Sequence, residues 1–395
     1  MTIDSGLPAI ESGLPDWRDK GFWAPDTPED PVGRRLVDGP FTWPLLVARD
    51  AALRHNVATM AGYLADRGVL HAPHAKTTMA PSLIAAQLAA GAWGLSAATA
   101  NHVLVYRRAG ARRVLLANQL LDPRPLGWLA RSLDADPDFE LLSYVDSLEG
   151  VAALAGTQGD RPLRVLVEVG YPDGRTGCRT VPEALAVARA AAASPRLEVA
   201  GVAGYEGKLS TVDEVRDFLG TLREAAETLR ADGCAPADGP LIVSAGGSVY
   251  FDVVAEELSG HGHDVIARPG AYVAHDHGFY AERSPLAATL RPALELWAQV
   301  LSVPEPGLAI VGMGRRDAPY DEGLPVLLCH ADGRPATGEV TALNDQHAYL
   351  RADGLRPGDV LRFGISHPCS AFDRWRVIPV VDDADRVTDL IRTYF

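Results

Sequence analysis

An apolar run and a helical pattern meet at Pro73-His74-Ala75-Lys76-Thr77-Thr78-Met79-Ala80-Pro81. The run Gly68-Val-Leu70 precedes this junction, and the helical pattern extends from Ser82 to Ala90. In a closed parallel barrel, the end of a strand points a side chain into the catalytic mouth. Lys76 is therefore a candidate Schiff-base nucleophile, although a lone lysine is more often a solvated surface cation. The rest of the chain has to decide between these two interpretations.

Eight apolar runs along residues 45–285 have the length of strands, and helical stretches such as Val181 to Ala193 and Val212 to Ala231 separate most of them. The runs are 68–73, 93–97, 113–118, 139–145, 163–169, 197–204, 240–245 and 264–268. This α/β pattern predicts a (β/α)8 barrel of the TIM type over residues 45–285. The alternative is an open doubly wound sheet. Such a sheet usually places its phosphate loop after the first strand, whereas here the glycine-rich turn follows the seventh.

The two ends of the chain lack the alternation of apolar runs and helical stretches found in residues 45–285. After residue 290, short alternating runs broken by turns predict a C-terminal all-β domain over residues 286–395. The runs are 296–303, 308–311, 325–330, 348–350, 360–363 and 376–381. Residues 1–44 are rich in Pro and Gly but contain Trp17, Trp23 and Trp43, so we expect this segment to pack on the β domain.

The composition excludes several classes of protein. The 37 basic and 51 acidic residues give a net charge of −14 without an acidic tail, which argues against nucleic acid as a partner. The first residues lack the pattern of an export signal, and no apolar run approaches the roughly 18 residues of a membrane span. We therefore expect a cytoplasmic protein with no membrane partner. The four cysteines are far apart, which disfavours a disulfide framework or a four-cysteine zinc site.

Two glycine-containing turns follow the seventh and eighth predicted strands. The first is Ser244-Ala-Gly246-Gly247-Ser248-Val249, and the second is Arg268-Pro-Gly270-Ala271-Tyr272. Successive backbone N–H groups and a hydroxyl can bind a phosphate, although a Gly-Gly pair alone is more often a plain tight turn. A lysine after the first strand and a phosphate site after the last two fit pyridoxal 5′-phosphate, which an imine would hold at one end and its phosphate at the other.

Two further strand ends present candidate cofactor contacts. Arg175, in Gly170-Tyr-Pro-Asp-Gly-Arg175-Thr-Gly177, could face the phenolic oxygen of the cofactor, and a loop arginine paired with Asp173 is about as plausible. Tyr205 follows the sixth predicted strand and could contact the pyridine ring. On local grounds an ordinary half-buried tyrosine is the better interpretation of Tyr205.

The C-terminal domain contains a candidate metal pair, His367 and Cys369. An imidazole and a thiolate two residues apart on an extended segment can point to the same side, and two protein ligands leave positions open for substrate or water. In isolation, a packed cysteine beside a capping histidine is the more common explanation. His275-Asp276-His277 is a rival metal pair that we rank lower. Leu343-Asn-Asp-Gln-His347 is a polar turn that needs no function.

Six motifs together resemble a known family. They are Pro-His-Ala-Lys76-Thr, Gly-Arg175-Thr-Gly, Gly-Tyr205-Glu-Gly, Ser-Ala-Gly246-Gly247-Ser, Arg-Pro-Gly270-Ala-Tyr and His367-Pro-Cys369. In this order, from about residue 45 to 395, they resemble the D-serine dehydratase and D-threonine aldolase family of fold-type III pyridoxal-phosphate enzymes. The resemblance implies an alanine-racemase-like barrel that carries the cofactor, a β domain that carries Zn²⁺ or another divalent metal, and a homodimer.

The resemblance also assigns roles to residues of this chain. Lys76 would form the imine, Arg175 would meet the phenolic oxygen, and Tyr205 would lie by the pyridine nitrogen. The remaining cofactor contacts would be Gly246, Gly247, Ser248, Gly270, Ala271 and Tyr272, with the phosphate held mostly through backbone. His367 and Cys369 match the metal pair, and cysteine at the second position is similar to the dehydratase branch, because the aldolases carry aspartate there.

This chain departs from the family pattern at two places. Thr77-Thr78-Met79 stands where the family often has Thr-His-Lys, so a nearby polar contact is missing. The stretch from Val311 to Asp321 differs from the usual Asp-x-Gly-x-Lys pattern at the start of the β domain. Both departures affect the choice of substrate more than the chemistry.

The resemblance implies a lyase that acts on a small D-amino acid. The leading hypothesis is metal-assisted dehydration of a D-3-hydroxy amino acid such as D-serine to a 2-oxo acid and ammonia. The alternative enzyme is a D-threonine aldolase that releases glycine and an aldehyde. Two non-enzymatic readings stay open, a pyridoxal-phosphate carrier and a ligand-binding barrel without a cofactor. The metal pair argues against a carrier, which needs no Lewis acid.

Overall fold

The computed structural model describes residues 13–235 and 239–395. The first twelve residues, on which the expected lack of an export signal depends, lie outside this description. The described chain forms two compact units, one of residues 60–76 and 87–270 and the other of residues 13–59, 77–86 and 271–395. Helices α1 (Asp50–Ala65) and α2 (Pro81–Ala89) each contribute residues to both units.

The first unit is built on an eight-stranded parallel sheet in the order β2-β9-β8-β7-β6-β5-β4-β3. The strands are β2 (Leu70–His71), β3 (Leu95–Ala97), β4 (Arg113–Gln119), β5 (Glu140–Val145), β6 (Leu163–Glu168), β7 (Leu197–Ala203), β8 (Leu241–Ala245) and β9 (His263–Ala267). The backbone N–H of Trp93 donates to His71 O at 2.8 Å, and that of Ser96 donates to Pro73 O at 2.9 Å, so the two end strands meet. The sheet therefore closes, and the expected barrel is confirmed with all eight strands at the predicted positions.

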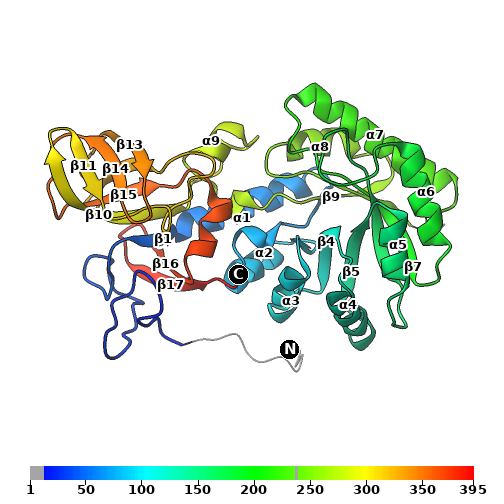
Figure 1. Cartoon of the computed structure of the whole chain (residues 1–395), viewed down its shortest axis with the longest axis horizontal. Helices are drawn as coiled ribbons and strands as arrows, with labels where there is room; N and C mark the ends of the chain where they lie inside the picture. The colour runs from blue at the N-terminus through cyan, green and yellow to red at the C-terminus, as the bar shows by residue number, and fades with distance from the viewer. Residues whose placement is uncertain (1–12, 236–238) are drawn as a thin grey trace. The chain divides into compact units, whose positions relative to one another are not determined.

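Helices surround this sheet on its outer side (Figure 1). They are α3 (Ala100–Arg108), α4 (Pro123–Ala135), α5 (Leu148–Ala155), α6 (Val181–Ala192), α7 (Val212–Ala231) and α8 (Phe251–Leu258). The sequence starts several of them with a side-chain cap. Thr211, for example, accepts from the N–H of Glu214, while the Glu214 carboxylate accepts from the N–H of Thr211. Such caps fix where each strand-to-helix loop ends and thereby how its side chains are presented.

The interior of the barrel is filled by mostly apolar side chains that successive strands contribute. Its core cluster contains Leu115, Leu142, Tyr144, Leu166, Ala200, Ala203, Ile242 and Ile266. Gly201 is required on β7, because a Cβ there would lie 1.9 Å from the carbonyl oxygen of Ile242 on β8. The packed interior leaves the carboxyl ends of the strands as the place for chemistry.

The second unit contains a nine-stranded, mostly antiparallel sheet. Its strands are β1 (Leu45–Arg49), β10 (Leu294–Glu305), β11 (Leu308–Val311), β12 (Val326–His330), β13 (Gly338–Leu343), β14 (Ala348–Ala352), β15 (Val360–Gly364), β16 (Val377–Val381) and β17 (Val387–Arg392). The main path is β13-β14-β11-β10-β1-β16-β17, and β15 pairs with β10 and β12. Strand β1 thus belongs to this sheet, where it lies between β10 and β16.

Residues 13–44 lie against the strands of the second unit. The N–H of Gly33 donates to Val387 O at 2.8 Å, and the N–H of Val387 donates to Arg34 O at 2.9 Å. The Trp43 and Trp297 rings stack with centroids 5.8 Å apart. Backbone pairing and aromatic packing therefore anchor this irregular segment without regular structure of its own.

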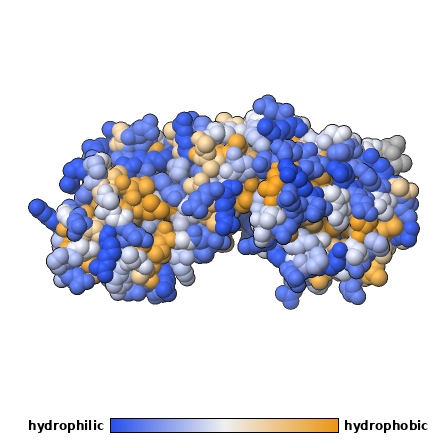
Figure 2. All heavy atoms as spheres, turned by 90° about the horizontal axis from the view of Figure 1, so that it is seen from above, coloured by the Kyte–Doolittle hydropathy of each residue, from blue (hydrophilic) through white to orange (hydrophobic). Residues whose placement is uncertain are grey.

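Hydrophilic residues cover most of the face shown in Figure 2, with apolar groups scattered between them. Among the described residues, no helix combines the length and apolar character that a membrane crossing requires. Short helical turns complete the chain at η1 (Ala75–Thr77), η2 (Ala271–Val273), α9 (Phe279–Arg283), η3 (Pro368–Ser370) and η4 (Phe372–Arg374).

Candidate active site

Most of the predicted cofactor residues follow carboxyl ends of barrel strands. Lys76 follows β2, Arg175 follows β6 and Tyr205 follows β7, while Gly246 to Ser248 follow β8 and Gly270 follows β9. Because parallel strands end at the same edge, all of these residues belong to one mouth of the first unit. Ala271 and Tyr272 come directly after Gly270 in the buried turn η2, which belongs to the second unit.

Lys76 is exposed on the short turn η1. Burial and then the charge of Lys76 hold the pKa of His74 well below its usual range, and the same two causes lower the pKa of His102. Both imidazoles are therefore neutral near pH 7. The charge of Lys76 therefore lies near two neutral imidazoles at the barrel mouth, and the role of its amine in an imine stays a prediction.

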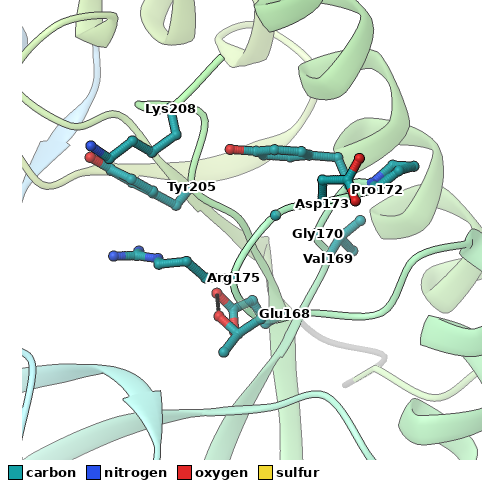
Figure 3. A pocket seen from close by; sticks show the side chains of 11 residues that line it. Glu168, Val169, Gly170, Pro172, Asp173, Arg175, Tyr205 and Lys208 are labelled. Carbon is teal, nitrogen blue, oxygen red and sulfur yellow. Dashed lines mark hydrogen bonds between the residues drawn. The ribbon is translucent and has the colours of Figure 1, made fainter.

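Arg175 and Tyr205 line a pocket of about 250 Å³ (Figure 3). The guanidinium carbon of Arg175 lies 4.6 Å from the centroid of the Tyr205 ring, a cation–π contact. Lys208 and Glu168 also line the pocket. Its size is near the lower end of small-molecule sites, which start at roughly 300 Å³. Arg175 thus contacts an aromatic ring, and no ion pair with Asp173 is present among the described residues.

Glu168 was missed by the sequence reasoning. It ends β6 inside the mouth, is 5% exposed, and accepts from Thr176 Oγ1 at 3.0 Å and from the amide of Gln119. Burial raises the pKa of Glu168 despite these donors. The only sequence signal was a charged residue at the end of the apolar run Val165-Leu-Val, which a half-exposed strand end explains equally well.

The glycine turn binds a carboxylate of the chain itself. The Glu206 side chain is fully buried and accepts from the N–H of Gly246 at 3.1 Å and of Gly247 at 2.8 Å. Gly246 has a φ of +87°, and a Cβ on Gly247 would lie 3.1 Å from the Tyr205 ring. The two N–H groups therefore converge on an oxyanion, as an anion-binding turn requires. Their contact with a phosphate stays a prediction.

Ser248 and Arg268 connect the two glycine turns. Ser248 Oγ accepts from the N–H of Gly270 at 3.2 Å. Arg268, another residue given no role from the sequence, is 4% exposed and donates to Ser244 Oγ at 2.5 Å and to Gly204 O at 2.7 Å. Arg268 thus ties together the ends of β7, β8 and β9 and places a buried positive charge at the mouth.

The candidate metal pair lies in the second unit, directly after β15. His367 Nδ1 is 2.8 Å from Asp321 Oδ2, and Cys369 Sγ is 3.8 Å from Thr77 Oγ1 and 3.9 Å from the Tyr280 hydroxyl. Burial lowers the pKa of His367, but the Cys369 thiol and the Asp321 carboxylate outweigh burial and raise the pKa to about 9. The structure therefore places the two side chains together in a polar setting.

The rival metal pair is arranged differently. Asp276 accepts the N–H groups of Gly278 and Tyr280 at 2.9 Å and so caps α9. Burial lowers the pKa of His275 to about 4 and also lowers the pKa of His277. Within the described ranges, no three His, Cys, Asp or Glu side chains converge as a metal site. The segment Leu343 to His347 joins β13 to β14, as expected of a turn.

The residues at the barrel mouth fit pyridoxal 5′-phosphate by their chemistry. They supply an amine, a guanidinium beside an aromatic ring, and a glycine turn of anion-binding geometry, in which Glu206 occupies the N–H groups of Gly246 and Gly247 in this structure. The imidazole and thiol of His367 and Cys369 suit Zn²⁺ as two of its ligands. The roles of the individual side chains toward pyridoxal 5′-phosphate and Zn²⁺ stay predictions.

Two family models match this chain. The alanine racemase N-terminal domain matches residues 49–273, which is more than half of the chain, and the "Putative serine dehydratase domain" matches residues 293–381. The first match covers the barrel, and the second covers much of the β domain.

Several curated enzymes are similar over most of their length. A 3-hydroxy-D-aspartate aldolase of Paracoccus denitrificans is 27% identical over 85% of this chain and 87% of that enzyme. A D-threonine aldolase of an Arthrobacter species is 29% identical over 91% and 92%, respectively. A D-threo-3-hydroxyaspartate dehydratase of a Delftia species is 28% identical over 78% and 83%.

The fold of the Delftia dehydratase is also similar. Its solved structure superposes with a TM-score of 0.73 at 24% identity, covering 89% of this chain and 97% of that one. The motifs, the barrel and the family matches agree. The chain belongs to the alanine racemase N-terminal domain family of fold-type III enzymes, its β domain matches the serine dehydratase domain, and it is a pyridoxal-phosphate-dependent lyase.

Proposed function

We propose that this enzyme dehydrates a D-3-hydroxy amino acid, such as D-serine, to a 2-oxo acid and ammonia with the help of Zn²⁺ or another divalent metal. The observation that carries this choice is the proximity of Cys369 to His367 in the β domain. By the family resemblance, a cysteine at that position is typical of the dehydratase branch. The named relatives act on hydroxy amino acids of the D series, which supports the substrate class.

The barrel residues provide binding and proton transfer in this proposal. Pyridoxal phosphate supplies an electron sink that stabilises negative charge at the substrate Cα. The Lys76 amine takes the Cα proton, and the cation–π contact with Tyr205 holds Arg175 at the cofactor. Arg268 holds the ends of the neighbouring strands together at the mouth through its bonds to Ser244 and Gly204.

His367 and Cys369 hold the metal in this proposal. A divalent ion is a Lewis acid that makes the β-hydroxyl a better leaving group, a contribution of several kcal/mol. The substrate loses one proton and one hydroxide as water, and the released enamine hydrolyses to the 2-oxo acid and ammonia. One solved structure of a D-threo-3-hydroxyaspartate dehydratase is a cysteine-to-alanine variant in a metal-free form, which is consistent with a metal in that enzyme.

Retro-aldol cleavage is the second candidate function, because two of the similar enzymes are named aldolases. In that reaction the β-hydroxyl loses its proton, the Cα–Cβ bond breaks, and glycine and an aldehyde are released. The same residues would serve both reactions. The reactions differ in the β-hydroxyl, which leaves in the dehydration and loses only its proton in the retro-aldol cleavage.

Product identification separates the two reactions. The purified enzyme is incubated with D-serine, D-threonine and D-threo-3-hydroxyaspartate, and 2-oxo acid, ammonia, glycine and aldehyde are measured. We expect equal amounts of 2-oxo acid and ammonia. Glycine with an aldehyde would instead establish the aldolase.

Removal of the metal tests the second half of the proposal. After treatment with a chelator, turnover should be lost while the cofactor absorbance remains, because the metal pair and the glycine turns belong to different units. Added Zn²⁺ should restore turnover. The Cys369→Ala variant should lose turnover and should not recover it with Zn²⁺. Undiminished dehydration by the metal-free enzyme would contradict this role.

A further inference from the structure

The side chain of Asp321 contacts the residues on both sides of Cys369. Its Oδ2 is 2.8 Å from His367 Nδ1, and its Oδ1 accepts from Ser370 Oγ at 2.8 Å. Both carboxylate oxygens are therefore engaged, one before and one after the thiol in the chain. A third bond, from Ser366 Oγ to Gly323 O at 2.7 Å, joins the same two segments again.

The bond to Nδ1 determines which ring nitrogen of His367 can bind a metal. A carboxylate only accepts hydrogen bonds, so Nδ1 carries the proton and the lone pair of the neutral ring is on Nε2. Ring nitrogens that bind metals are typically oriented by such a carboxylate on the opposite nitrogen. The rings of Phe279 and Tyr280, with centroids 5.7 and 5.8 Å from that of His367, further limit its rotation.

We propose that Asp321 is a positioning residue that fixes the tautomer of His367 and its spacing from Cys369 for metal binding. This inference rests on the proposed metal role of the pair. Asp321 belongs to the stretch in which this chain departs from the family pattern, so the resemblance did not assign it a function. In the structure, Asp321 of that stretch contacts His367 and Ser370, which flank Cys369.

The test is the Zn²⁺ affinity of full-length, tag-free enzyme with its cofactor bound, measured by competition with a chromophoric chelator. In Asp321→Asn, an amide that donates to Nδ1 favours the proton on Nε2 and blocks the metal. We expect Zn²⁺ to bind 10- to 100-fold more weakly, the usual effect of losing such a partner. Ser370→Ala removes one of the two contacts and should weaken binding less than Asp321→Asn.

Asp373→Asn is the matched control, since Asp373 is a half-exposed carboxylate in the neighbouring turn η4 and contacts Arg374. It should bind Zn²⁺ like the wild type. Nitrogen NMR of His367 in the metal-free protein, at an alkaline pH where the ring is neutral, provides a readout that a folding defect would not imitate, because the tautomer should shift from Nδ1–H toward Nε2–H in Asp321→Asn. Equal Zn²⁺ affinity of Asp321→Asn and wild type would overturn the inference alone. Wild-type Zn²⁺ binding that is unchanged in His367→Ala would overturn both the inference and the proposed metal site.

Discussion

Glu206 shows what sequence reasoning captures at a single residue and what it misses. The glycine turn after β8 was recognisable, because a second glycine-containing turn follows the next strand and the two together favour an anion-binding site. The carboxylate that binds its N–H groups lies 40 residues earlier in the chain, and no local pattern connects the two. Arg268 is similar, since its partner Ser244 is on β8 and its partner Gly204 directly follows β7. The chemistry of such residues depends on long-range contacts.

Substitution of Glu206 by Gln should weaken cofactor binding. The amide has one acceptor oxygen and places an NH₂ group against a backbone N–H, which leaves a buried donor unsatisfied at a cost of about 1–3 kcal/mol. We expect a lower unfolding temperature and a higher pyridoxal-phosphate Kd, measured by absorbance titration of the apoprotein. Glu224→Gln, on the exposed face of α7, is the control and should change neither value. An unchanged Kd in Glu206→Gln would mean that the contact of Glu206 with the turn does not support cofactor binding.

At the scale of elements, the strands of the barrel were predictable and several strands of the β domain were not. The barrel strands are buried on both faces and appear as apolar runs. By contrast, β13 is Gly-Glu-Val-Thr-Ala-Leu and is mostly exposed, so its sequence resembles a loop. The sequence of β17 mixes polar and apolar residues. Strand β1 is apolar but is followed directly by helix α1, as a strand of the barrel would be. Their partners in the sheet, rather than their own residues, make them strands.

The loop that presents Arg175 depends on Arg179. The Arg179 guanidinium donates to Thr176 O and Gly174 O at 2.8 Å and to Gly177 O at 2.9 Å. We expect Arg179→Ala to increase hydrogen exchange of residues 170–178 and to raise the cofactor Kd several-fold, with Arg179→Lys intermediate because an ammonium cannot span these carbonyls. Arg189→Ala, which removes a surface ion pair with Asp232, should leave both quantities unchanged. Unaltered hydrogen exchange of residues 170–178 in Arg179→Ala would show that Arg179 does not stabilise this loop.

Three strands of the β domain are joined by a buried ion-pair cluster around Glu295. Its carboxylate binds Arg49 of β1 at 2.6 Å and Arg362 of β15 at 2.9 Å. Burial alone would raise the pKa of Glu295, but the two arginines lower it to about 2. Because the folded pKa lies below the ordinary value of 4.5 that applies in the unfolded chain, this stabilisation is present above about pH 4.5 and is lost as the pH falls toward 2.

Glu295→Gln should therefore destabilise the enzyme in a pH-dependent way. At pH 7 we expect a loss on the order of 3 kcal/mol, since one partner of a buried pair is removed. The difference from wild type should shrink as the pH is lowered from 5 toward 3, and urea denaturation across that range measures it. Glu305→Gln, at the exposed end of β10, is the control. A difference that stays constant with pH would show that packing, not charge, is responsible.

At the scale of the whole molecule, the quaternary structure is a proposal from the family resemblance. We predict a homodimer, to be measured by light scattering of the cofactor-loaded enzyme during gel filtration. The prediction fails if the enzyme is fully active at concentrations where its mass is that of one 42.1 kDa chain.

The central claim is that Lys76 carries pyridoxal phosphate at the mouth of this barrel, and the chain offers a direct test because it has three lysines, Lys20, Lys76 and Lys208. Lys20 contacts Asp317 in the second unit, whereas Lys208 lines the pocket with Arg175 and is the serious competitor. Borohydride reduction of the loaded enzyme attaches the cofactor permanently to the lysine that binds it, and peptide mass spectrometry then locates it. We predict the added phosphopyridoxyl mass on Lys76, with labelling abolished in Lys76→Ala and retained in Lys208→Ala. Labelling of Lys208 in the wild type, or of no lysine, would contradict the account.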